Sequence, residues 1–471
     1  MKPRNIFLCL FSHFSIFHSL KFAPFRLASF FHKTPTPPNS PNINGFYGLI
    51  GPKINITKKL SLFDLFTGDG VIQGVFINQG NVSWQEHIIQ TEKIKYERIF
   101  GKMSKSVFLL PLMLALHHLH IIPNVLGLAN TAILNVNNRT YSLFERDLPY
   151  ELSVNYSNAE IQTIGKRVIQ GIHCFSGHSK YHPDTGIIST LEYDYIRKTV
   201  NIYQLDTEFQ TIHKKAIQMK YLPITHDYLV YGDHSECMLF CDSPFVIQGH
   251  LILQGKIPIV LDHALPTYIH TYNFTDGTHN TYRISERGYY IFHFSKAEVD
   301  DRRLVIYGSL YDKLDFNTID ICGKYRRIEI PLEMEDSGVG TGVGAVIQDI
   351  LVESRGYNLD FPVLWNNTVI LRNIEISERG GTRINGFVLM DEKDGIRVKQ
   401  EIFYDDLCFC GEPAVCYDAS GEPYLVSFAY DAVECEGSVC GWFVMIHLKT
   451  FQMIKKELPV RPTIGFHSIF I

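Results

Sequence analysis

Residues 184–194 read DTGIISTLEYD and combine a turn with a strand. Asp184-Thr185-Gly186 is a typical turn sequence, and Ile187–Tyr193 contains the β-branched and aromatic side chains that strands favour. The same combination occurs earlier in the chain, where Gly68-Asp69-Gly70 precedes Val71–Ile77. Many short strands separated by turns, without alternating helices, predict an all-β protein built as a propeller or as stacked sheets.

The composition is that of a folded globular protein without a nucleic-acid partner. The 471 residues suffice for one large β domain or for two or three ordinary ones. The formal net charge of -5 gives no basis for general nucleic-acid binding. The 10 cysteines include no pair of CxxC knuckles, so we expect reduced thiols and no structural zinc site.

The first part of the chain differs in composition from the rest. Residues 1–63 contain no Asp or Glu but several Lys and Arg, which is typical of an organelle transit peptide. The short apolar run Ile6–Leu10 leaves a secretory signal as the alternative. Thr34–Pro38 is Pro-rich and is expected to form an extended linker. We therefore predict a leader and linker over 1–41 and one folded domain over 42–471.

One apolar segment interrupts the series of strands. Val107–Leu116 reads VFLLPLMLAL, which is too short for a bilayer span of about 20 residues. It is either a buried core helix or an apolar helix that enters one leaflet of a membrane. No other stretch approaches the length of a transmembrane helix.

Five blocks resemble the plant plastid branch of the carotenoid cleavage oxygenase family. In chain order they are Gly127–Thr131, Leu143–Tyr150, His178–Gly186, Cys410–Pro413 and Ile464–Ile471. They resemble the family patterns GLANT, LxExDLPY, HPKxDPxTG, GGEP and YGFHGLFV. One such block is weak evidence, but five in the family order are specific.

The resemblance implies a fold and an activity. The fold would be a seven-bladed β-propeller with short apolar helices capping one face. The activity would be Fe(II)-dependent cleavage of a conjugated double bond in a carotenoid or apocarotenoid, with dioxygen as co-substrate and two carbonyl products. The protein would supply an apolar tunnel, and Val107–Leu116 would contact a membrane or lipid droplet. The plastid, either its stroma or its plastoglobules, would be the location.

In this family four histidines hold the iron, because neutral imidazoles bind it and leave positions open for dioxygen. By block position, His178 matches the first histidine, His270 the third and His467 the fourth. Ile224-Thr225 sets a register that puts Lys220 at the position of the second histidine. A protonated lysine cannot coordinate iron, so the resemblance implies a three-histidine site.

Two other histidines near Lys220 could complete the site only if this register slipped. They are His213 and His226, and along an extended strand His226 would lie roughly 20 Å from Lys220. We therefore expect neither to replace the missing ligand.

Three glutamates orient the imidazoles in the family by accepting their second N–H groups. Glu145 matches the first and Glu412 matches the third. The middle acid aligns near Gly380, where no carboxylate stands in register.

Two further functions remain as alternatives to an active dioxygenase. The apparent loss of one histidine and one acid favours a catalytically impaired member that keeps the fold and binds an isoprenoid. A hydrolytic or sugar-binding propeller would instead use a carboxylate pair. Asp300-Asp301 and Asp405-Asp406 are such pairs, but adjacent acids in turns are usually solvated.

Overall fold

The chain divides into two units, Met1–Asn39 and Ser40–Ile471, and only residues of the second are described. The computed structural model describes residues 41–54, 61–101, 112–113, 116–117, 121–122, 124, 127–300, 302–319, 322–332, 346–349, 356–376, 382–391, 397–432 and 440–471. The predicted leader and most of Val107–Leu116 lie outside these ranges. Within them, no helix is both long and apolar enough to cross a membrane.

The first sheet joins strands from both ends of the second unit. Its order is β3-β2-β1-β31, and all the neighbouring strands run antiparallel. The bounds are β1 (Gly45–Pro52), β2 (Gly70–Asn78), β3 (Asn81–Ile88) and β31 (Ser468–Phe470).

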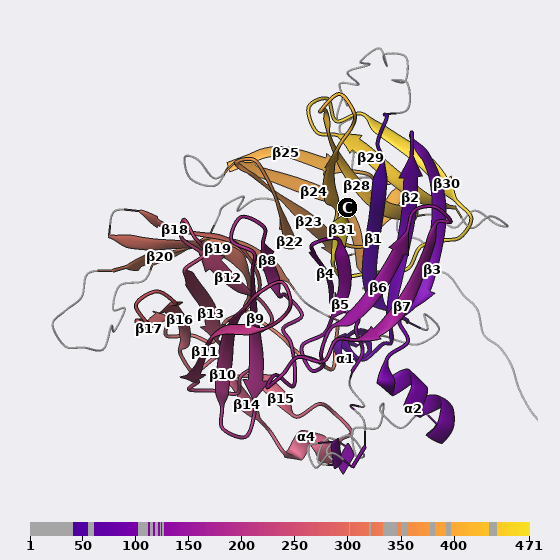
Figure 1. The fold of residues 1–471 in the computed structure, drawn as a ribbon. Helices are drawn as coiled ribbons and strands as arrows, with labels where there is room; N and C mark the ends of the chain where they lie inside the picture. Colours follow the sequence, from indigo (N-terminus) through magenta and orange to yellow (C-terminus); the bar gives the residue numbers. More distant parts are fainter. Residues whose placement is uncertain are drawn as a thin grey trace, which may run out of the picture. The chain divides into compact units, whose positions relative to one another are not determined.

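Three four-stranded sheets follow in chain order (Figure 1). The first contains β4 (Ala132–Val136), β5 (Arg139–Leu143), β6 (Tyr150–Asn155) and β7 (Glu160–Lys166). The second contains β8 (Lys180–His182), β9 (Ile187–Asp194), β10 (Thr199–Leu205) and β11 (Thr211–Gln218). The third contains β12 (Tyr228–Tyr231), β13 (Cys237–Asp242), β16 (Thr267–Asn273) and β17 (His279–Ser285).

Two further sheets, one of four strands and one of nine, complete the series. One sheet contains β18 (Tyr290–Asp300), β19 (Arg303–Tyr311), β20 (Gly323–Pro331) and β21 (Val346–Asp349). A nine-stranded sheet contains β22 (Leu359–Trp365), β23 (Thr368–Ile376), β24 (Thr382–Asp391), β25 (Arg397–Phe403), β26 (Leu407–Phe409), β27 (Ala414–Tyr417), β28 (Pro423–Asp431), β29 (Gly441–His447) and β30 (Met453–Leu458).

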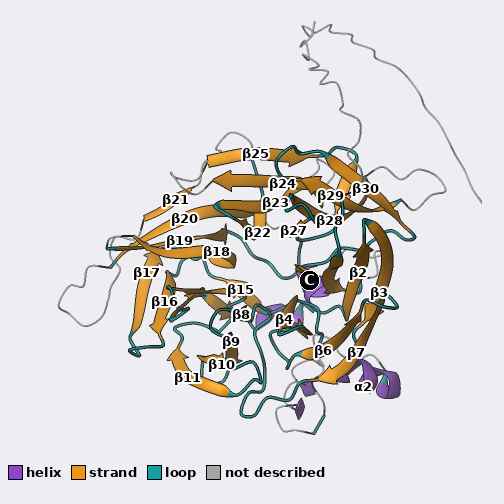
Figure 2. Ribbon diagram, turned by 45° about the horizontal axis from the view of Figure 1, so that its top comes forward, coloured by secondary structure: helices purple, strands orange, loops and turns teal. Residues whose placement is uncertain are grey.

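The hydrophobic core lies between neighbouring sheets, because each sheet has two apolar faces. In β13, Met238 and Phe240 pack toward β9 and β10, whereas Leu239 and Cys241 pack toward β18 to β20. This alternation follows from the period of two along a strand. Similar clusters join every sheet of the series to the next and join the nine-stranded sheet back to the first. The sheets therefore form a closed ring, visible in Figure 2.

The helices are short and lie between strands of this ring. Those whose bounds fall within the described residues are α1 (Leu62–Phe66), α2 (Glu92–Phe100) and α4 (His250–Leu253). The α1 and α4 helices are apolar, as predicted for helices over one face. By contrast, α2 contains charged residues along its length and does not fit that prediction. A small hairpin of β14 (Phe245–Ile247) and β15 (Ile259–Leu261) encloses α4.

Candidate metal centre

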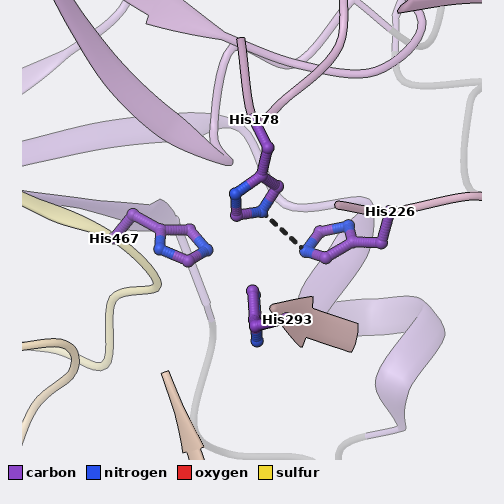
Figure 3. A group of neighbouring side chains, drawn as sticks. All are labelled: His178, His226, His293 and His467. Atoms are coloured by element: carbon purple, nitrogen blue, oxygen red, sulfur yellow. Dashed lines mark hydrogen bonds between the residues drawn. The ribbon is translucent and has the colours of Figure 1, made fainter. Parts of the chain in front are cut away.

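Four histidines, each within or just before a strand of a different sheet, converge in the interior (Figure 3). His178 stands two residues before β8, and His226 stands two residues before β12. His467 immediately precedes β31, while His293 lies near the start of β18. Each of these strands is the edge strand of its sheet. The ring thus brings together side chains that are far apart in the sequence.

The four imidazoles are close enough to share one metal ion. One nitrogen from each ring can be chosen so that all four lie within 4.8 Å of one another. The Nε2 atoms of His178 and His226 are 3.0 Å apart. The ring centroid of His178 lies 4.4 Å from that of His467 and 5.1 Å from that of His293.

Three carboxylates orient three of these rings: Asp360 is buried, and Glu145 and Glu412 are partly buried. Glu145 Oε1 accepts a hydrogen bond from His226 Nδ1 at 2.6 Å. Asp360 Oδ1 accepts from His293 Nδ1 at 2.8 Å, and Glu412 Oε1 accepts from His467 Nδ1 at 3.1 Å. Donation through Nδ1 fixes the tautomer and leaves the Nε2 lone pair directed at the centre.

The Nε2 atoms of His293 and His467 are buried and have no hydrogen-bond partner among the residues that the structure describes. Buried polar nitrogens without partners are costly, and a metal ion would satisfy both. His226 Nε2 accepts a hydrogen bond from His178 Nε2 at 3.0 Å, and a metal ion would replace this bond as the partner of both nitrogens. The donor set therefore fits a divalent metal that prefers imidazole, such as iron.

The protonation of the site favours metal binding. Burial, together with repulsion from the other three imidazoles and Lys180, lowers the pKa of His178 well below its usual value. Burial also lowers the pKa of His293, although Asp360 opposes this effect. Burial raises the pKa of Glu145, but the hydrogen bond and positive charge of His226 outweigh it, so this pKa is lowered overall. The lowered pKa values of His178 and His293 favour neutral rings, and the lowered pKa of Glu145 favours the charged carboxylate; a bound cation needs these forms.

A cavity of about 470 Å³ opens onto this centre. Its lining includes His226, His293 and His467, and most of the remaining wall is apolar. Leu62 and Leu65 of α1 and Ile252 of α4 contribute to that wall. A largely apolar cavity of this size beside a few polar groups is typical of a site for a small organic ligand.

Two of the histidines proposed from the sequence meet in this group, and the third does not. His178 and His467 both belong to it. His270 is buried elsewhere, in β16, where its ring contacts Asp242, His279 and Thr281. The ring at the centre is that of His293 instead.

The sequence contained a signal for His293. In the family block HxxNA, alanine follows the histidine by four residues. His293 is followed by Ala297, whereas His270 has Asn273 but Phe274 at the alanine position. The prediction of His270 rested on Asn273, which matches the asparagine of that block.

The assignment of Lys220 to the second ligand position requires a correction. Lys220 is exposed, and its Nζ lies 3.7 Å from the centroid of the Tyr268 ring. The segment 220–227 is not an extended strand, so the expected separation of roughly 20 Å does not apply. His226 reaches the centre from this segment, and His213 lies in β11 beside Phe274.

The expected gap among the orienting carboxylates is also corrected. Glu145 and Glu412 lie where they were predicted, each on an imidazole. The third carboxylate is Asp360 in β22, which is 20 residues before the expected position at Gly380. Gly380 lies outside the described residues. A β-bulge between Asp360 and Val363 shifts the register of β22, and sequence spacing alone does not reveal it.

The profile of the family described as Retinal pigment epithelial membrane protein (RPE65) matches residues 41–471. The chain belongs to this family, which includes the carotenoid cleavage oxygenases. This confirms the resemblance inferred from the five sequence blocks. A β-propeller is the fold of this family, and the ring of sheets agrees with it.

Curated relatives are similar at low identity. The chain is 23% identical to a probable carotenoid cleavage dioxygenase 4, chloroplastic, of Arabidopsis thaliana, over 91% of this chain and 76% of that protein. It is 22% identical to a carotenoid 9,10(9',10')-cleavage dioxygenase of Crocus sativus, over 91% of this chain and 84% of that protein. A similar enzyme of Phaseolus vulgaris is 25% identical but matches over only 45% of this chain and 41% of its own length.

Solved structures of carotenoid oxygenase relatives share the fold. The lignostilbene dioxygenase of Pseudomonas brassicacearum superposes with a TM-score of 0.70 at 16% identity, covering 91% of this chain and 92% of that one. Cobalt-substituted ACO of Synechocystis gives a TM-score of 0.70 at 16% identity, covering 92% and 93%.

Proposed function

We propose that this carotenoid cleavage oxygenase binds iron(II) and cleaves a conjugated carbon–carbon double bond of a carotenoid or apocarotenoid with dioxygen. The observation that supports this proposal is the group of four histidines, three of them oriented by carboxylates, beside a largely apolar cavity. Bound iron(II) would supply the activation of dioxygen that the protein's own side chains cannot provide.

The residues of the chain would perform binding, orientation and exclusion of water. His178, His226, His293 and His467 would hold the metal through neutral nitrogens. The aromatic rings that line the cavity, including Phe292 and Phe466, would hold a flat polyene with one double bond near the centre. No protein side chain is required as a covalent nucleophile in this scheme.

A catalytically impaired relative was the alternative, because one histidine and one acid appeared to be missing. The four-histidine group and the Asp360 carboxylate remove these two grounds. We therefore propose an active oxygenase over a relative that only retains the fold. The carboxylate pairs considered for hydrolysis carry no support: Asp405 is fully exposed, and Asp301 lies outside the described residues.

The first experiment is iron loading. The full chain would be loaded with iron(II) without dioxygen and desalted, and iron per chain would be measured. We expect about one iron per chain, and we expect it to be lost in His226→Ala and in His293→Ala because each removes a ligand.

Two matched variants serve as controls. Each changes a residue that the sequence pattern matched to a ligand position but that lies outside the group of four histidines. Lys220→His and His270→Ala should bind as much iron as the unaltered chain. Iron that depends on His270 but not on His293 would overturn the ligand assignment. Cleavage would then be followed as aldehyde products from a carotenoid in detergent micelles under dioxygen.

The propeller would have seven blades. The nine-stranded sheet contains its own apolar cluster, between β22–β25 on one side and β26–β30 on the other, as neighbouring sheets do. Counting this sheet as two blades places histidines on four blades and carboxylates on the other three. The transit-like leader over 1–41 and the chloroplastic relatives support a plastid location.

A further inference from the structure

A buried arginine lines the same cavity and has no hydrogen-bonding partner within the described part of the chain. Arg372 lies in the middle of β23 and is 7% exposed. Its Nε atom is buried and has no partner, and its guanidinium makes no hydrogen bond to any residue that the structure describes. Burial lowers the pKa of Arg372 to about 10 despite the nearby Asp360, Tyr311 and Glu412, which raise it.

The guanidinium lies one aromatic ring away from the metal centre. Its Cζ atom is 3.4 Å from the centroid of Phe361. The Phe361 ring in turn lies 4.7 Å from the ring of His467 and 4.3 Å from that of His293, measured between centroids. A group bound by Arg372 would therefore sit in the cavity close to the reacting part of the substrate.

The two acids near Arg372 make their hydrogen bonds to other groups. Asp360 is its cross-strand neighbour, but its two oxygens accept from His293 Nδ1 and from the Tyr311 hydroxyl. The two oxygens of Glu412 accept from His467 Nδ1 and from the backbone N–H of Ser468. Both acids direct their oxygens at other donors, and neither makes a hydrogen bond to the guanidinium.

The other two arginines in the cavity wall are satisfied by the protein. Arg383 Nε donates to Glu375 at 2.6 Å, and its NH1 donates to the carbonyl of Asp405. Arg146 donates to the Tyr195 hydroxyl at 3.2 Å. Of the three arginines in this wall, Arg372 is therefore the one whose N–H groups are available to a ligand.

We propose that Arg372 binds a carboxylate of the substrate, so that the favoured substrate is a conjugated polyene bearing an acid group. The planar guanidinium matches a carboxylate through two parallel N–H···O bonds, and a buried cation gains most from an anionic partner. A hydrocarbon carotene would offer the N–H groups of this cation no hydrogen-bond acceptor in the cavity. The inference rests on the proposed oxygenase function, since it names the substrate class of that same site.

The test compares a polyene acid with its neutral methyl ester. Retinoic acid and methyl retinoate share one polyene, and only the acid is ionised at neutral pH. Their dissociation constants would be measured by equilibrium dialysis against the full chain without dioxygen, with and without iron(II). We expect the acid to bind about tenfold more tightly or better, because hydrogen bonds to charged groups are the stronger kind.

Matched variants assign the preference to one side chain. Arg372→Gln should abolish the preference for the acid, while Arg383→Gln, which removes an arginine already paired, should keep it. Equal affinities for acid and ester in the unaltered chain would overturn the proposal, and this comparison needs no variant to fold. A preference that survives Arg372→Gln would also overturn it. A chain that binds no iron but still prefers the acid would refute the oxygenase function alone.

Discussion

At the scale of single residues, the Asp360 carboxylate orients one side of the metal centre. It binds His293 Nδ1 at 2.8 Å and the Tyr311 hydroxyl at 2.5 Å. Burial alone would raise the pKa of Asp360, but the positive charge and hydrogen bond of His293 and the bond from Tyr311 lower it to about 2. The side chain therefore stays charged and fixes the orientation of the imidazole.

Asp360→Asn is expected to weaken iron(II) binding about tenfold to a hundredfold, because losing a carboxylate that orients a metal-binding imidazole has effects of this size. Competition with a chelator would measure the affinity. Tyr311→Phe is the matched control, since it removes the other bond to Asp360 but keeps the one to His293, and its loss should be smaller. Equal losses in the two variants would show that Asp360 acts through Tyr311 instead.

At the scale of elements, the loop before β8 packs closely against Thr131 and the Glu145 carboxylate. Gly177 precedes His178, and a Cβ atom there would lie 2.7 Å from Thr131 Cγ2 and 3.1 Å from the Glu145 carboxylate. Thr131 and Glu145 are themselves joined through the threonine hydroxyl at 3.3 Å. Only glycine allows this close approach of the loop to the carboxylate that orients His226.

Gly177→Ala should therefore destabilise the chain by about 1–3 kcal/mol, the usual cost of overpacking, and reduce iron loading as Glu145 is displaced. Urea unfolding and iron content would be measured on the same preparation. Gly165→Ala is the control, because a Cβ atom on Gly165 in β7 would meet nothing within 4 Å. Unchanged iron content in Gly177→Ala would contradict the proposed contact.

For the whole molecule, the last strand closes the ring and carries a site residue with it. β31 pairs with β1, and backbone bonds join Ile471 to Phe46 in both directions at 2.7 and 3.0 Å. The carbonyl of His467 accepts from the backbone N–H of Ile50 at 2.9 Å. The same backbone pairing therefore closes the ring and positions His467.

Removal of residues 468–471 is expected to lower the midpoint of thermal unfolding by about 5 °C or more, because it deletes several backbone hydrogen bonds and the packing of Phe470. Iron loading should fall with it, although every histidine of the centre is still present. Ile469→Val keeps the strand and should leave both quantities nearly unchanged. Full iron loading in the shortened chain would separate the site from ring closure.

The sequence by itself determined the family, the all-β fold class, and the four positions His178, His467, Glu145 and Glu412. These residues lie in blocks whose turn and strand patterns keep their spacing, so local sequence locates them. Only the tertiary structure decided that His226, His293 and Asp360 complete the centre. Their places depend on a non-extended segment before β12 and on bulges in β18 and β22, which change register without changing composition. Lys220 and His270 matched the family pattern locally, but in the folded chain Lys220 is exposed and His270 is buried in β16, outside the histidine group.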